Sequence, residues 1–242
     1  MGEPCPNLNC GYCIPCHPPN LLGFRKKKTR NIPDTRVVFT SRYFILDTRF
    51  WNQNKTNKIA HLLSSDCVQW LIEQAKEGNW SKEDVGSVVC RQNSDNQLIL
   101  ATLDEETQKQ VAVFNKEKTN EVAHLLSADF QHWLIQQAKE GQWSKEDVGS
   151  IVCKKNTDNQ LILATLDMET QKQVAQFNQE RTNEVAHLMS AEFIEWLLLE
   201  ASAGRWSKED VGSIMFRKNA DNQLVLGTLD EKTPLHFLLQ AI

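Results

Sequence analysis

Long apolar runs and targeting signals are missing from this chain of 242 residues. No apolar stretch approaches the roughly 18 residues that a membrane-spanning helix needs. The first residues, MGEPCPNLNCGYC, lack the basic start and apolar stretch of a secretory signal. We therefore expect no transmembrane helix, and we expect a cytoplasmic protein with reduced thiols.

Recognisable catalytic motifs are missing as well. The sequence contains no G-x-S-x-G, P-loop, H-E-x-x-H or glycine-rich dinucleotide turn. No base, nucleophile or substrate pocket can be named, so the sequence favours a protein without catalytic activity of its own. A metal-dependent enzyme is the weakest of the alternatives.

Proline and positive charge are both scarce beyond the N-terminal region. Six of the seven prolines lie within residues 1–35, which predicts extended or irregular backbone there. Residues 1–36 hold six basic and two acidic side chains, a net charge of +4. Since the whole chain has a net charge of −4, the remaining residues carry −8. An acidic array argues against nucleic acid as a partner, because it cannot follow a phosphate backbone.

What the sequence does contain is a repeat with a period of 63 residues. The string WSKEDVGS occurs at 80–87, 143–150 and 206–213, and DNQL begins at Asp95, Asp158 and Asp221. A fixed period of this kind is typical of stacked structural units that bury their apolar faces on one another. The predicted organisation is a Cys-rich basic head (1–35), a degenerate half-repeat (36–51) and a three-copy array (52–242).

The middle copy predicts two helices in succession. Ser127 is a suitable N-cap for a helix that places Phe130 and Leu134 on one face, and Gly141 is a suitable C-terminal cap. A second helix is predicted to start at Ser144, with Asp147 three residues later as the reciprocal acceptor. Trp143 and Val148 stand at the two positions of a hydrophobic staple.

The second half of the copy is less regular. We expect a third helix capped by Asp167 and extending through Phe177, and a fourth short helix from near Thr182. The pattern leaves open whether residues 97–103, 160–166 and 223–229 form strands or extended connectors. The fold class predicted is all-α, with four helices per copy arranged as two hairpins in a helical solenoid.

The end of the last copy resembles the ankyrin repeat family. Thr233-Pro234-Leu235-His236 is similar to the opening of the ankyrin helix, and Val211 to Met215 followed by Asn219-Ala220-Asp221 is similar to the second helix and its loop. Lys232 stands where the family has glycine, and the other copies keep less of the motif. The resemblance implies helical hairpins with a concave or loop-lined surface that binds another protein. It implies no catalytic activity of the chain itself.

Three cysteines have a simple interpretation in the register of the repeat. Cys67 aligns with Phe130 and Phe193, while Cys90 and Cys153 align with Phe216. Free cysteine behaves as a small hydrophobe, so a position that accepts cysteine or phenylalanine is predicted to be core.

The head has four further cysteines within twelve residues, and several interpretations stay open. Zinc is bound by four thiolate or imidazole ligands, so a predicted zinc site consists of Cys5, Cys10, Cys13, Cys16 and His17. The alternatives are an acylated anchor beside the basic residues 25–30, which would make the chain a peripheral membrane adaptor, or a disordered head. A redox dithiol and a haem-attachment site are also formally matched.

The histidines and the variable polar positions complete the prediction. His61, His124 and His187 share one repeat position, which favours a structural, hydrogen-bonded role or a shared ligand contact over a catalytic or metal-binding role. Polar positions that change between copies are candidates for contact with a protein partner. The predicted partner-binding residues are Arg91, Gln92, Lys154, Lys155, Arg217 and Lys218, in connectors around 91–97, 154–160 and 217–223.

Overall fold

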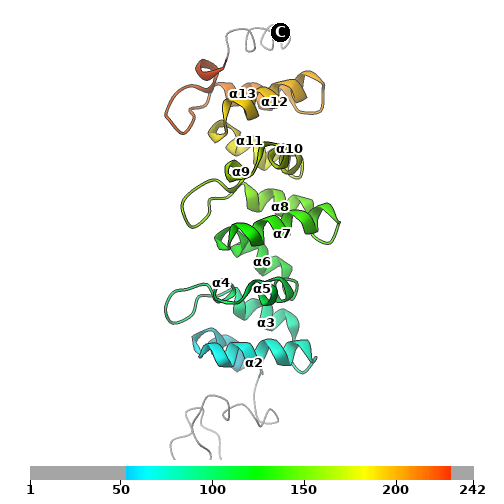
Figure 1. Ribbon diagram of the computed structural model, residues 1–242, viewed down its shortest axis with the longest axis vertical. Coiled ribbons are helices and arrows are strands. Elements are labelled where there is room, and N and C mark those ends of the chain that lie inside the picture. The colour runs from blue at the N-terminus through cyan, green and yellow to red at the C-terminus, as the bar shows by residue number, and fades with distance from the viewer. Residues whose placement is uncertain (1–52, 230–242) are drawn as a thin grey trace, which may run out of the picture. The chain divides into compact units, whose positions relative to one another are not determined.

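The computed structural model describes residues 53–229 and divides the chain into two compact units, Met1–Leu46 and Asp47–Ile242. All described residues belong to the second unit (Figure 1). The predictions for the head, for the half-repeat at 36–51 and for Thr233-Pro234-Leu235-His236 lie outside the described residues. Between 53 and 229 the chain forms thirteen α-helices and four 3-10 helices and no strand, which confirms the all-α class there.

The longest helices have twelve residues and form hairpins with the helices that follow them. Each long helix packs against an eight-residue helix across a tight turn. The three pairs are α2 (Ser65–Lys76) with α3 (Lys82–Val89), α7 (Ala128–Lys139) with α8 (Lys145–Val152), and α12 (Ala191–Ser202) with α13 (Lys208–Met215).

Shorter elements connect these hairpins. A loop and a single helical turn come first: α4 (Ile99–Thr102), α9 (Ile162–Thr165) and the 3-10 helix η5 (Val225–Thr228). Next come α5 (Glu105–Ala112) and α10 (Met168–Ala175). The last are α1 (Gln53–Ile59), α6 (Lys116–Val122) and α11 (Gln179–Val185), which continue into η2 (Ala60–Leu62), η3 (Ala123–Leu125) and η4 (Ala186–Leu188).

The predicted start and stop signals of the middle copy are present. The Ser127 hydroxyl accepts from the Phe130 N–H at 3.3 Å and the Ser144 hydroxyl from the Asp147 N–H at 3.2 Å. Gly141 ends the first hairpin helix with a φ of +75°, a left-handed conformation that glycine adopts without steric cost.

Two predictions about the connecting segments are wrong. The segments at 97–103, 160–166 and 223–229 are neither strands nor extended connectors, because each contains one helical turn that follows an isolated antiparallel bridge. The fourth helix of the middle copy begins at Gln179 rather than near Thr182. Its N-cap is Asn178, whose side-chain Oδ1 accepts from the Arg181 N–H at 3.1 Å.

Aromatic side chains hold each hairpin together. Trp143 is only 4% exposed, its ring meets Trp133 edge-on at 5.9 Å, and its indole N–H donates to Asn120 Oδ1 at 2.8 Å. The same edge-on pairing joins Trp70 to Trp80 and Trp196 to Trp206. Edge-to-face pairs are a favoured aromatic geometry, so the tryptophan of the WSKEDVGS string is a packing residue.

The cysteine prediction is confirmed in part. Cys67 is buried, but Cys90 and Cys153 are half-buried, with their thiols 3.8 and 3.9 Å from the hydroxyls of Thr119 and Thr182. Phe216, at the equivalent position of the third copy, is 65% exposed, so the assignment of this position to the core is wrong there. No helix in the described range is long and apolar enough to cross a membrane.

Candidate partner-binding site

One short loop follows the second helix of each of the three hairpins, and these loops lie at 91–98, 154–161 and 217–224. Each loop closes through an antiparallel bridge, Gln92 with Leu98, Lys155 with Leu161 and Lys218 with Leu224. The residue after each loop donates its backbone N–H to the carbonyl of the first loop residue. In the middle loop, the Ile162 N–H donates to the Lys154 carbonyl at 3.1 Å. Figure 1 shows the three loops projecting on the same side of the second unit.

The loop shape is fixed by asparagine. In the middle loop Asn156 Oδ1 accepts from the N–H groups of Asp158 at 3.0 Å and Gln160 at 2.9 Å. Asn159 adopts a φ of +62°, a left-handed conformation that asparagine tolerates better than most residues. The other two loops have the same contacts through Asn93 and Asn219, so the three backbones match.

The exposed side chains on these matching loops differ. The second position is Gln92, Lys155 or Lys218, and the fourth is Ser94, Thr157 or Ala220. All of these side chains are exposed. A constant backbone with changing side chains is the usual arrangement of binding loops on a rigid scaffold.

All six predicted partner-binding residues lie on these loops and are exposed. Arg217 has a second role, because its guanidinium donates to the carbonyls of Glu184 at 3.1 Å and Asn183 at 3.4 Å near the end of α11. The loops therefore combine exposed cations with contacts that fix the position of at least one of them.

Two of the repeated histidines, His124 and His187, lie near these cations. Burial lowers the pKa of His124, and the positive charge of Lys154 lowers it further. Burial and Arg217 have the same two effects on the pKa of His187. The Nδ1 atoms of His61, His124 and His187 are buried and have no hydrogen-bond partner within the described range. Hydrogen bonds to the backbone of Glu121 and Glu184 partly offset the lowered pKa of His124 and His187.

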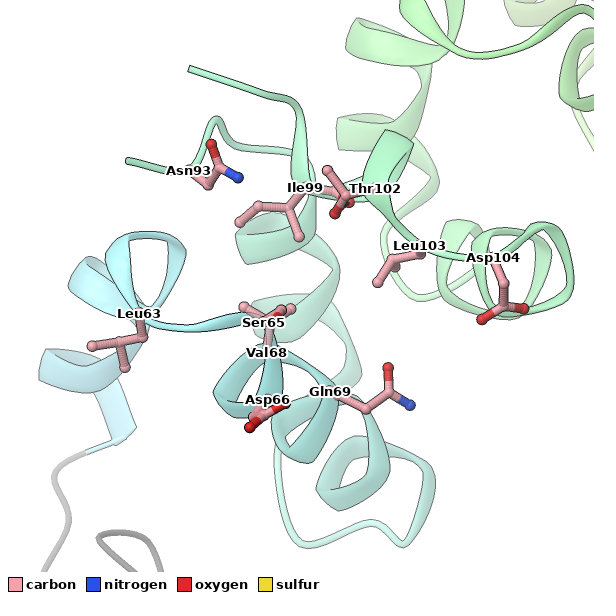
Figure 2. A pocket seen from close by; sticks show the side chains of 10 residues that line it. All are labelled: Leu63, Ser65, Asp66, Val68, Gln69, Asn93, Ile99, Thr102, Leu103 and Asp104. Atoms are coloured by element: carbon pink, nitrogen blue, oxygen red, sulfur yellow. Dashed lines mark hydrogen bonds between the residues drawn. The ribbon is translucent and has the colours of Figure 1, made fainter. Parts of the chain in front are cut away.

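A cavity of about 270 Å³ lies beside the first loop. Figure 2 shows how α2, the loop, α4 and the start of α5 surround it. Its lining residues are Leu63, Ser65, Asp66, Val68, Gln69, Asn93, Ile99, Thr102, Leu103 and Asp104. Sequence reasoning did not find this cavity, because its lining comes from two separate segments, 63–69 and 93–104, and carries no motif.

The described residues offer little reactive chemistry. Burial raises the pKa of the Cys67, Cys90 and Cys153 thiols to about 11 in each case. Since the thiolate is the reactive form, these cysteines are poor nucleophiles at neutral pH. No group of three metal-ligating side chains occurs in the part of the chain that the structure describes, and the predicted zinc ligands of the head lie outside it.

Comparisons with protein-family models, with curated proteins and with solved structures find no match for this chain.

Proposed function

We propose that this chain is a protein-interaction module without catalytic activity of its own. In this proposal a solenoid of 63-residue helical repeats, similar in principle to ankyrin arrays, presents the three loops at 91–98, 154–161 and 217–224 to an extended protein partner. The observation that carries the proposal is the contrast between the matching loop backbones and their differing exposed side chains.

The contacts between successive hairpins support a solenoid. Helix α6 packs on both α3 and α8, and α11 packs on both α8 and α13. Asn178 at the start of α11 donates through its side-chain Nδ2 to Ser150 Oγ at 2.9 Å, and Asn115 does the same to Ser87 Oγ at 2.8 Å. Each unit thus depends on the next for its packing, as the units of repeat proteins do.

Charge reversal in the middle loop tests the docking proposal. The double variant Lys154→Glu, Lys155→Glu should weaken capture of partners that the wild-type chain retains, while its melting temperature changes little, because both residues are exposed. A matched control reverses Lys76 and Lys139, which are exposed in the last turns of α2 and α7. These helix ends lie on the side of the second unit opposite to the loops (Figure 1).

The two outcomes separate the loops from the head. Loss of capture in the loop variant alone supports the proposal. If the loop variant captures as well as wild type, and deletion of residues 1–35 abolishes capture, recognition belongs to the head and the proposal is wrong.

A further inference from the structure

Two joints of the same construction link the three hairpins. In each joint a socket helix, α3 or α8, packs on a docking helix that belongs to the next unit, α6 or α11. The socket helix carries the glycine of the WSKEDVGS string, and the docking helix begins after an asparagine that lies against this glycine: Asn115 against Gly86, and Asn178 against Gly149. Because both joints have the same close contact, they show what a socket and a docking helix require.

Further contacts cross the first joint through side chains of both helices. Lys82 Nζ lies over the Phe114 ring, 5.6 Å from its centroid. The Cys90 thiol is 3.8 Å from the Thr119 hydroxyl. The second joint has both contacts as well. A docking helix is therefore recognised by an aromatic residue that is followed by asparagine and, four positions later, by threonine.

Helix α13 has the WSKEDVGS sequence of a socket, but no later docking helix packs on it within residues 53–229. No atom of the described chain lies within 4 Å of a Cβ placed on Gly212. Ser213 is exposed, and Phe216, the C-cap residue, is 65% exposed. Residues 230–242 lack the docking pattern, since Ala241 stands at the register position of the asparagine. The socket face of α13 is therefore uncovered by the described chain.

Helix α1 has the opposite deficit, because it belongs to a docking sequence for which the chain has no socket sequence. Residues 51–56 read WNQNKT, which matches FNKEKT at 114–119 and FNQERT at 177–182. One period before the first WSKEDVGS string the chain reads HPPNLLGF, at 17–24. Helix α1 packs on α3, and Figure 1 shows α3 and α13 toward opposite ends of the second unit. The unmatched socket and the unmatched docking helix of one chain therefore cannot meet each other.

We propose that α13 of one chain binds α1 of a second copy, so that copies of the chain associate head to tail through a third joint of the same construction. Asn52 would then lie against Gly212, and Lys208 would lie over the ring of Trp51. Tryptophan is the aromatic side chain that attracts a cation most strongly. A head-to-tail contact between identical chains builds rings or open filaments. The inference goes beyond the proposed function, since it concerns the ends of the array and not its loops.

The residues that distinguish this third joint change on both of its sides. Phe216 takes the place of the cysteine in the internal sockets. At the first joint the pKa of that cysteine is set mainly by burial, and the charges of Glu121 and Lys118 also act on it, so both side chains lie near the thiol. The corresponding residues of α1 are Lys55 and Lys58. Both neighbours of the Phe216 ring would therefore be cations, which an aromatic ring attracts.

Sedimentation velocity on the full chain measures this association. The sedimentation coefficient of the wild type should rise with protein concentration. Gly212→Ala should weaken the association by about tenfold or more, which corresponds to about 1.4 kcal/mol. The added Cβ would meet Asn52 as a Cβ on Gly149 would meet Asn178 Cβ, at 2.7 Å. The variant chain itself should give the circular dichroism of the wild type, because its own described residues leave room for the methyl group.

Charge reversal in α1 tests the other side of the joint. Lys55→Glu, Lys58→Glu should weaken the association about fivefold, because it removes the cations beside Phe216. The matched control is Lys154→Glu, Lys155→Glu, which changes the net charge equally but lies in the middle loop. The control should associate as the wild type does, although it is expected to lose partner capture.

Mixing the two weakened variants tests the direction of the contact. Gly212→Ala keeps an intact α1, and Lys55→Glu, Lys58→Glu keeps an intact α13. An equal mixture should form a complex of two chains at concentrations where neither variant associates alone, and this complex should not grow further. A contact between two identical ends would give no such complementation.

Three results would overturn the head-to-tail joint: a wild type that stays monomeric at every concentration, unchanged association of Gly212→Ala, or a mixture that forms no two-chain complex. A monomeric wild type with loop-dependent capture would remove only the head-to-tail joint. Association that depends on Gly212, together with capture that does not depend on the loops, would remove only the docking role of the loops.

Discussion

Asn115 lies directly against Gly86, so closely that a Cβ atom on the glycine would be 2.7 Å from Asn115 Cβ and 2.8 Å from its backbone nitrogen. Real Cβ atoms essentially never come so close to other heavy atoms. Asn178 and Gly149 have the same relationship one repeat later. The glycine of the WSKEDVGS string therefore makes room for the N-cap of the helix that starts the next unit.

Adding a methyl group at this contact should destabilise the array. Gly149→Ala should reduce the free energy of unfolding by about 1–3 kcal/mol, the usual cost of overpacking. In urea denaturation the transition should move to lower concentration.

Gly212 is the matched control for this substitution. It occupies the same position in α13, but no atom of the described chain lies within 4 Å of a Cβ placed there. Gly212→Ala should stabilise by up to about 1 kcal/mol, because alanine is the better helix former. Equal effects of the two substitutions would show that the Asn178 contact is unimportant.

Trp143 should contribute strongly to stability. Trp143→Ala should cost about 3–5 kcal/mol, since it removes a buried aromatic side chain. Trp143→Phe should cost less, about 1–3 kcal/mol, because it keeps the packing but leaves Asn120 Oδ1 without its donor. Chemical denaturation measures both, and a loss below about 0.5 kcal/mol for the alanine variant would mark an exposed surface residue instead.

The left-handed residue of the middle loop should tolerate only glycine. Asn159→Gly should change stability little, whereas Asn159→Val should cost at least about 1–2 kcal/mol, the penalty for a left-handed conformation in an ordinary residue. The same two variants should also differ in partner capture, and Asn159→Val should capture less partner than Asn159→Gly. If the two variants match in melting temperature and capture, the backbone of the loop does not depend on its φ of +62°.

The pKa of His124 should reflect its buried environment. The pKa of His124 is lowered by burial first and by Lys154 second, so the folded state disfavours its charged form. Stability should therefore be fully present above the unfolded pKa of about 6.5 and be lost as the pH falls below that value. In an NMR titration Lys154→Gln should raise the pKa of His124 but leave it below 6.5, since burial remains.

The sequence predicted well wherever one residue type has one local role. Serine before an acidic first turn marked the start of α8, and Gly141 marked the end of α7, because capping depends on residues a few positions apart. The positions of the three loops were also predictable, since Asp-Asn-Gln-Leu combines a turn with an apolar anchor at a fixed spacing.

Contacts between distant segments could not be predicted in the same way. The Gly149–Asn178 contact spans 29 positions, and its only signal is that both residues recur in phase one repeat earlier, at Gly86 and Asn115. The exposure of Phe216 was not predicted, because its alignment with Cys90 and Cys153 shows only that the position accepts apolar side chains of different size and does not show that it is buried. The cavity beside the first loop was missed because two separate segments, 63–69 and 93–104, line it together.

Both proposals depend on the claim that the helical units fold as one coupled array. The most direct test is to excise residues 114–176, one full period of the repeat, and to compare its circular dichroism with that of residues 53–229. The account predicts that the excised unit has little helical signal and no cooperative urea transition, because its faces toward α3 and α11 are uncovered. A helical fragment with a cooperative transition would contradict it.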